Sequence, residues 1–99
     1  MCGAPDQAQT LPAGTDLSRE TVLVGKVLLD GEPLGGAFVR LLDGSGEFVA
    51  EVVSSASGDF RFFSAPGTWT IRALSRSGNG VVEVHAAAPG RHEVDVTVG

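Results

Sequence analysis

The residues best suited to chemistry near neutral pH are one thiol and two imidazoles. Cys2 is the single cysteine of the chain, and it directly follows Met1. Removal of Met1 would place the thiol beside a free α-amine. Because such amines titrate near about 8 and thiols near about 8.5, a neighbouring ammonium favours the thiolate. A thiolate at Cys2 could accept sulfane sulfur from a persulfide and pass it on, or it could bind a metal through sulfur and nitrogen. The alternative interpretation is an incidental thiol without a role.

The two histidines, His85 and His92, flank a turn at residues 86–91 and are therefore predicted at one end of the domain. Together with Cys2 they could in principle form a Cys/His metal site with an open position. Strand alternation, however, turns His92 inward and His85 outward, which argues against convergence. No carboxylate stands at ligand spacing in the turn. We predict ordinary histidines at the rim, with no metal and no cofactor.

Three large apolar side chains are predicted to face away from the core: Phe38, Leu42 and Phe63. Arg40 marks the outward face of its strand, and Phe38 and Leu42 share that face with it. If the three lie side by side, they form an exposed apolar patch, which is typical of an interface. The alternative is cover by the N-terminal arm, through Leu11 or Leu17. A homo-oligomer also remains open.

These candidates depend on the strands that position them, and residues 58–73 give the clearest strand pattern. Phe60 and Phe62 alternate with polar residues, and the alternation resumes after Pro66-Gly67 with Trp69 and Ile71 on one face. Period-two alternation is typical of a strand that is buried on one side, and Pro-Gly favours a turn. The sequence predicts a hairpin here, at the centre of the core.

The rest of the chain extends this pattern to seven strands. They are expected at residues 20–30, 37–42, 48–53, in the two arms of the 58–73 hairpin, at 81–85, and in a final strand carrying Val94, Val96 and Val98. The first strand has apolar residues on both faces and is expected to be covered on both. Glu51 is taken as outward, which turns Phe48 inward. Links of about 3–7 residues favour antiparallel connections.

Composition agrees with this architecture. The chain has 99 residues, 42% hydrophobic and 19% charged, with 14 glycines and five prolines. Such values are typical of one globular domain rich in turns, and no clean helical period is seen. Residues 1–19 show no periodicity and are predicted as an N-terminal arm. Residues 20–99 are predicted to form an all-β, seven-stranded antiparallel β-sandwich.

Charge and cysteine usage exclude several classes of partner. The formal net charge is −5, and six arginines and one lysine are scattered singly. The chain therefore lacks the basic footprint that binds nucleic acid or anionic membranes. It has no apolar run near the roughly 18 residues that a membrane helix needs, and no signal peptide is recognised. A lone cysteine fits a reducing compartment, so a cytoplasmic location is expected.

Four segments resemble the carboxypeptidase regulatory-like domain. They are Val-Gly-Lys-Val at 24–27, Gly-Ala-Phe-Val-Arg-Leu at 36–41, Ser-Gly-Asp-Phe-Arg-Phe at 57–62 and Pro-Gly-Thr-Trp-Thr-Ile at 66–71. The resemblance covers residues 20–75, and it implies the transthyretin-like, or prealbumin-like, seven-stranded sandwich of that domain. The domain usually has Tyr where Trp69 stands. The indole still fills the core, but the tyrosine hydroxyl is lost.

A second resemblance covers the whole chain. Met-Cys-Gly-Ala-Pro at 1–5, Gly-Gly-Ala-Phe-Val-Arg-Leu-Leu at 35–42, Gly-Asp-Phe-Arg-Phe-Phe at 58–63 and His-Glu-Val-Asp-Val at 92–96 are similar to a small uncharacterised bacterial family. Its members are typically encoded beside a rhodanese-type thiosulfate sulfurtransferase, which implies a link to sulfur metabolism. A rhodanese itself needs a cysteine in an anion-binding loop of an α/β domain. This chain has neither feature.

Three functions follow as hypotheses. The first is a non-catalytic accessory protein of sulfur metabolism that docks a rhodanese-type sulfurtransferase and uses Cys2 as sulfur acceptor. The second is a structural or protein-binding module that uses the Phe38 and Leu42 face, with no role for Cys2. The third is a small enzyme, for which the sequence offers no convergent cluster of titratable groups.

Overall fold

Residues 14–99 fold into nine β-strands joined by turns. The computed structural model describes residues 14–99, and within them it contains no helix. The strands are β1 (Thr21–Leu29), β2 (Glu32–Pro33), β3 (Phe38–Leu42), β4 (Phe48–Val53), β5 (Asp59–Ser64), β6 (Gly67–Ser75), β7 (Gly78–Ala86), β8 (Gly90–Glu93) and β9 (Val96–Val98).

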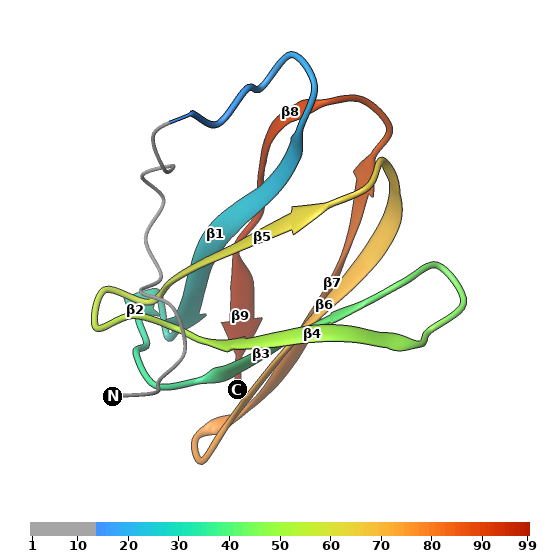
Figure 1. Ribbon diagram of the computed structural model, residues 1–99. Helices are drawn as coiled ribbons and strands as arrows, with labels where there is room; N and C mark the ends of the chain where they lie inside the picture. The colour runs from blue at the N-terminus through green and yellow to red at the C-terminus, as the bar shows by residue number, and fades with distance from the viewer. Residues whose placement is uncertain (1–13) are drawn as a thin grey trace, which may run out of the picture.

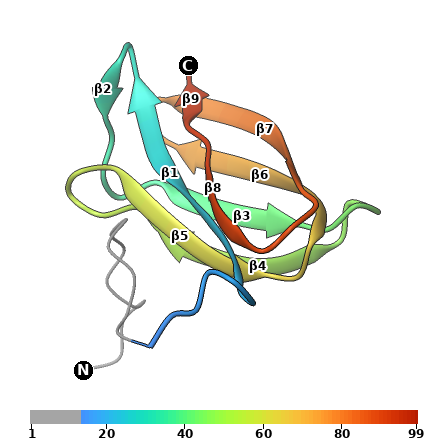
Figure 2. The same cartoon turned by 90° about the horizontal axis from the view of Figure 1, so that it is seen from above.

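The strands form two sheets that pack face to face (Figure 1; Figure 2). In the first sheet β1 is central, with β5 and β2 on one side and β8 and β9 on the other. The second sheet has the order β4-β3-β6-β7. Side chains from both sheets meet in one core, whose largest buried members are Phe60, Leu23, Leu41 and Ile71. The predicted all-β sandwich is confirmed.

The hairpin predicted at residues 58–73 is confirmed as β5 and β6. Phe60 and Phe62 are buried, and their rings lie 6.1 Å apart between centroids. Trp69 packs against the core from the start of β6, and its indole Nε1–H donates to the carbonyl of Ala65 at 2.8 Å. The indole is thereby fixed in orientation by the turn that precedes its own strand.

Two predictions about the strands are wrong: the count of seven strands and the purely antiparallel sandwich. Strand β1 pairs antiparallel with β5 but parallel with both β8 and β9. The predicted final strand is divided into β8 and β9, and the two-residue β2 is additional. The expected cover on both faces of β1 is confirmed, because Val22 and Val24 are as fully buried as Leu23 and Val27 on the core side.

The division between β8 and β9 lies directly over Gly25. The amide of Val94 donates to the carbonyl of Val24 at 2.8 Å, while the carboxylate of Asp95 accepts from the amide of Lys26 at 3.0 Å. A β-carbon built on Gly25 would lie 1.5 Å from the carbonyl oxygen of Val94. Glycine is therefore needed here for the close approach of two backbones.

One side of the sandwich is closed by a second close approach of two backbones at a glycine. Strand β9 lies against β7, and a β-carbon on Gly80 would lie 2.0 Å from the carbonyl oxygen of Thr97. The amide of Gly99 also donates to the carbonyl of Asn79 at 3.4 Å. The two sheets are thus joined along β7 and β9, whereas on the opposite side they end in the neighbouring edge strands β4 and β5.

The predicted inward orientation of Phe48 is wrong. A bulge between Leu41 and Leu42 pairs Leu41 with Ala50 but Leu42 with Phe48, so Val49 is an extra residue in β4. One extra residue reverses strand parity. Phe48 consequently joins Leu42 on the outer face and is 60% exposed.

A polar turn precedes the bulge. The carboxylate of Asp43 accepts hydrogen bonds from the hydroxyl and amide of Ser45 and from the amide of Glu47. The Ser45 hydroxyl, with these backbone amides, holds the pKa of Asp43 below its ordinary value. The turn that leads into β4 is therefore organised around an ionised side chain.

Candidate functional site

The structure separates the predicted metal candidates. Cys2 lies outside the described residues. His85 Nδ1 lies 3.1 Å from the hydroxyl of Thr68, and its Nε2 lies 3.2 Å from the carboxylate of Glu83. His92 Nε2 instead donates to the carbonyl of Ala88 at 2.8 Å. Within residues 14–99, no three His, Cys, Asp or Glu side chains are grouped as a metal would require.

The three interface candidates do not form one patch. Phe38 and Leu42 share the outer face of the β4-β3-β6-β7 sheet, as parity predicts, and Phe38 is 51% exposed. Phe63 belongs to β5 in the other sheet, where the guanidinium of Arg61 lies 5.9 Å from the centre of its ring. Phe38 and Leu42 are therefore considered without Phe63, and Arg40 lies between them on the same face of β3.

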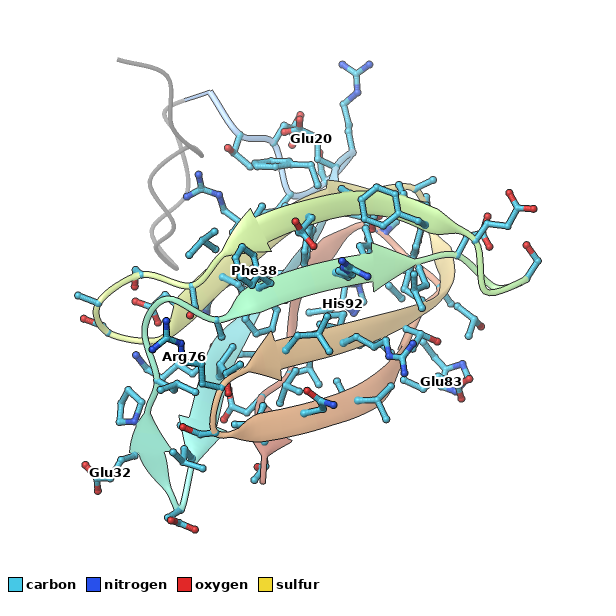
Figure 3. The ribbon with its side chains drawn as sticks, turned by 90° about the horizontal axis from the view of Figure 1, so that it is seen from below. Glu20, Glu32, Phe38, Arg76, Glu83 and His92 are labelled. Atoms are coloured by element: carbon cyan, nitrogen blue, oxygen red, sulfur yellow. The ribbon has the colours of Figure 1, made fainter. Side chains whose placement is uncertain are left out.

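We call the solvent side of the second sheet the outer sheet face. Cross-strand register places Val53, Phe38 and Leu74 in one row and Phe48, Leu42 and Thr70 in another. Its apolar members are Phe38, Leu42, Phe48, Val53, Leu74 and Val81. Figure 3 looks onto this sheet, with Phe38 and Arg76 toward one end and Glu83 toward the other.

Charges occupy the middle of the outer sheet face. The Nε of Arg40 donates to the carboxylate of Glu51 at 2.6 Å, across the β3–β4 pair. Arg72 lies opposite Arg40 on β6. Since both partners of the ion pair are solvent-exposed, it adds about 1 kcal/mol at most to stability. Its clearer effect is to give the face a polar centre between two apolar rows.

A hollow of about 500 Å³ adjoins the Phe38 end of this face. It is lined by Leu34, Gly35, Gly36, Phe38, Leu74, Ser75, Arg76 and Ser77. The hollow lies between the segment that leads into β3 and the turn that joins β6 to β7. An apolar side chain from a partner could enter it beside Phe38.

The second concave feature is a cleft of about 480 Å³ where the β4 and β5 edges of the two sheets diverge. It is named here the β4–β5 cleft. Its lining residues are Arg19, Glu20, Thr21, Leu41, Val49, Phe63, Ser64, Ala65, Pro66 and Trp69.

A turn at residues 16–20 forms one rim of the cleft. The carbonyl of Asp16 accepts from the amides of Arg19 and Glu20, and the Glu20 carboxylate accepts from the amide of Asp16. The hydroxyl of Ser18, and then its amide, hold the pKa of Asp16 below the ordinary value by hydrogen bonding to its carboxylate. These bonds fix the turn that presents Arg19 and Glu20 to solvent.

Two residues that line the β4–β5 cleft have buried hydroxyls without hydrogen-bond partners among the described residues. They are Thr21 and Ser64, which are cross-strand neighbours at the ends of β1 and β5. Parity turns both side chains toward the space between the sheets, and Thr21 is 2% exposed. Sequence analysis missed them because each resembles an ordinary polar residue at a strand end.

We expect the substitution Thr21→Val to stabilise the protein. Valine has nearly the shape of threonine, and a buried hydroxyl without a partner costs about 1 kcal/mol or more. The free energy of unfolding should therefore rise by about 1 kcal/mol in urea denaturation. Thr97→Val, at an exposed site on β9, is the matched control. A loss of stability in Thr21→Val would show that the hydroxyl is satisfied in solution.

The fold and its surfaces define the class of protein. The described residues form a β-sandwich with one exposed apolar sheet face and one inter-sheet cleft, and they contain no helix that could span a membrane. The chain belongs to the family described as "Protein of unknown function (DUF1416)", whose sequence pattern matches residues 2–98.

Relatives come from mycobacteria. The chain is 61% identical over 99 residues to "Uncharacterized protein Rv0814c" of Mycobacterium tuberculosis, covering 99% of each chain. It is 65% identical over 89 residues to an uncharacterized protein of Mycolicibacterium smegmatis, covering 89% of this chain and 99% of that one. These likenesses extend over almost the whole length and support the family assignment.

Similar solved structures show the fold alone. A DUF3823 family protein from Parabacteroides merdae matches with a TM-score of 0.61 at 22% identity, covering 82% of this chain and 46% of that one. The chain therefore spans less than half of that protein. The dioxygenase domain of a carbohydrate-binding fusion protein from Streptomyces sp. SirexAA-E matches with a TM-score of 0.61 at 13% identity, covering 98% of both.

Proposed function

We propose that the protein is a non-catalytic accessory protein that binds a partner protein through the outer sheet face. The observation that carries this proposal is the exposure of large apolar side chains there, with Phe38 at 51%, Phe48 at 60% and Val81 at 65%. Large exposed apolar areas on one face often mark interaction sites. The hollow beside Phe38 adds a place for an anchoring side chain of the partner.

The partner we propose is a rhodanese-type sulfurtransferase in the cytoplasm. Support comes from the resemblance of residues 1–5, 35–42, 58–63 and 92–96 to bacterial proteins encoded beside such enzymes. The mixed character of the outer sheet face also suits a partner that binds reversibly, because Arg40, Glu51 and Arg72 interrupt its apolar rows.

In the same proposal Cys2 is the sulfur acceptor. The Cys2 thiolate attacks the outer sulfur of the partner's cysteine persulfide. The sulfur–sulfur bond of that persulfide breaks, its electron pair stays on the partner's sulfur, and Cys2 becomes the persulfide. No net oxidant is needed, because the sulfane sulfur moves between two thiols. A nearby α-ammonium would favour the attacking thiolate.

Docking is tested by the substitution Phe38→Glu. A charge in place of the apolar side chain beside the hollow should weaken binding to the sulfurtransferase by at least about 30-fold, corresponding to roughly 2 kcal/mol. Isothermal titration calorimetry measures the affinity. Phe63→Glu is the matched control, because this phenylalanine has similar exposure on the other sheet. Equal loss in both variants, or binding unaffected by Phe38→Glu, would contradict docking through the outer sheet face.

Sulfur transfer is tested separately by intact-mass spectrometry. The wild type should gain the mass of one sulfur atom from the persulfide-loaded partner, and Cys2→Ser should gain none while binding as tightly as the wild type. No gain in the wild type, with alkylation showing an accessible thiol, would leave a docking module without a role for Cys2. Sedimentation of the wild type and Phe38→Glu alone would show whether the same face joins two copies of the chain.

A further inference from the structure

The β4–β5 cleft is a candidate binding site that is independent of the proposed docking through the outer sheet face. It is the place where the sandwich is open, since the opposite side is joined through β7 and β9. In Figure 1, β4 and β5 leave their shared loop together and then diverge toward the end where the cleft lies. Its volume of about 480 Å³ is within the range of small-molecule sites.

We propose that the β4–β5 cleft binds a small, neutral aromatic molecule that carries one hydroxyl or carbonyl group. The apolar part of the ligand would contact Leu41, Val49, Phe63 and Trp69, which come from both sheets. The indole N–H of Trp69 is already bonded to the carbonyl of Ala65. Trp69 therefore offers a ring surface rather than a donor, and aromatic rings pack well on such a surface.

The polar end of the ligand is defined by Thr21 and Ser64. Their hydroxyl oxygens are buried and have no partner among residues 14–99, and strand parity places both side chains between the sheets. A ligand would reach them by opening the end of the cleft beside them. Each hydroxyl can donate one hydrogen bond and accept others. A ligand hydroxyl could bond to both side chains, and a ligand carbonyl could accept from either.

The buried end of the ligand should be uncharged. Among residues 14–99, the charged lining residues of the cleft are Arg19 and Glu20, and both are exposed on the rim with opposite signs. An anion or cation beside Thr21 would thus lose its hydration without a buried counter-charge, which is costly. This separates the expected ligand from benzoate-like or amine-bearing compounds of the same size.

Fluorine NMR of the full chain with three matched probes tests the proposal. The probes are para-fluorophenol, para-fluorotoluene and para-fluorobenzoate, which have the same ring with a neutral polar, an apolar and a charged substituent. We expect para-fluorophenol to bind about tenfold more tightly than para-fluorotoluene, as one well-made hydrogen-bond arrangement allows. The benzoate should bind most weakly.

Protein variants then locate the contact. Thr21→Val should reduce the affinity for para-fluorophenol to that for para-fluorotoluene, and it should leave the latter unchanged. Thr97→Val should change neither. Val49→Trp, at a half-exposed position on the rim, should fill the cleft and abolish binding of both probes.

Four results would overturn the proposal. One is the absence of binding by any probe at millimolar concentration. Another is equal affinity of the wild type for the phenol and the toluene. The third is equal weakening of both probes by Thr21→Val, because that would indicate a change of shape rather than a lost hydrogen bond. Binding that survives Val49→Trp would place the site elsewhere and would also count against it.

Discussion

The substitution Gly25→Ala should destabilise the protein severely. The new methyl group would lie 1.5 Å from the carbonyl oxygen of Val94 and 2.9 Å from the ring of Phe60. Neither neighbour can move cheaply, because Val94 is hydrogen-bonded to β1 and Phe60 is fully buried. A backbone displacement of this size costs at least about 4 kcal/mol, against a total stability of about 5–15 kcal/mol for a domain.

Circular dichroism and urea denaturation would measure this loss. Gly44→Ala is the matched control, because a β-carbon there would have its nearest contact at 3.6 Å and the backbone does not need a positive φ. That variant should stay within about 0.5 kcal/mol of the wild type. If Gly25→Ala melted within a few degrees of the wild type, the close crossing of residue 94 over β1 would be wrong.

Ser54→Ala should cost about 2–3 kcal/mol of stability. The Ser54 hydroxyl accepts from the amide of Ala37 at 2.9 Å and donates to the carbonyl of Leu34 at 2.8 Å. Ala37 is fully buried, so its amide would lose its partner without access to water. Removing one partner of a buried hydrogen bond costs the desolvation of the group left behind, and here two groups are affected.

Thermal unfolding should show the effect of Ser54→Ala as a fall in Tm of roughly 10–20 °C for a domain of this size. Ser77→Ala, in the exposed turn between β6 and β7, serves as the control and should change Tm little. Because the segment held by Ser54 leads into Phe38, Ser54→Ala should also weaken partner binding. An unchanged Tm would mean that water replaces the hydroxyl, which would contradict the burial of Ala37.

Sequence periodicity was sufficient to predict the class of fold and the central hairpin. Alternation at Phe60, Phe62 and Ile71 predicts both the strands and the buried face, because one-sided burial imposes a period of two. It also placed Phe38 and Leu42 on the solvent side. These inferences depend on residues within one strand, where the geometry is local.

Features that join distant segments could not be predicted in this way. Short links favour antiparallel neighbours, so nothing near Val96 indicates that β9 pairs in parallel with β1. Gly25 did carry a signal, since glycine within a strand often marks a close approach, but the sequence does not identify Val94 as the partner. Phe48 was misplaced because the bulge at Val49 shifts parity without a glycine or proline to mark it.

The β4–β5 cleft escaped prediction for a related reason. Its wall combines Thr21, Leu41, Ser64 and Trp69, which stand on four different strands. No spacing rule connects them, and each residue fits its own strand pattern. Only the packing of the two sheets shows that Thr21 and Ser64 line the same cleft as the indole ring of Trp69.

The position of β1 in the first sheet has a consequence for biosynthesis. It leaves the ribosome before the other strands of residues 14–99, yet the bond from Lys26 to Asp95 spans 69 residues. Until β8 and β9 have been synthesised, one edge of β1 has no partner, and Leu23 and Val27 lie in an incomplete core. Nascent chains in this state are prone to aggregate and are substrates for chaperones. The domain therefore completes its folding only after β8 and β9 have left the ribosome, and slowly, because its central pairing is non-local.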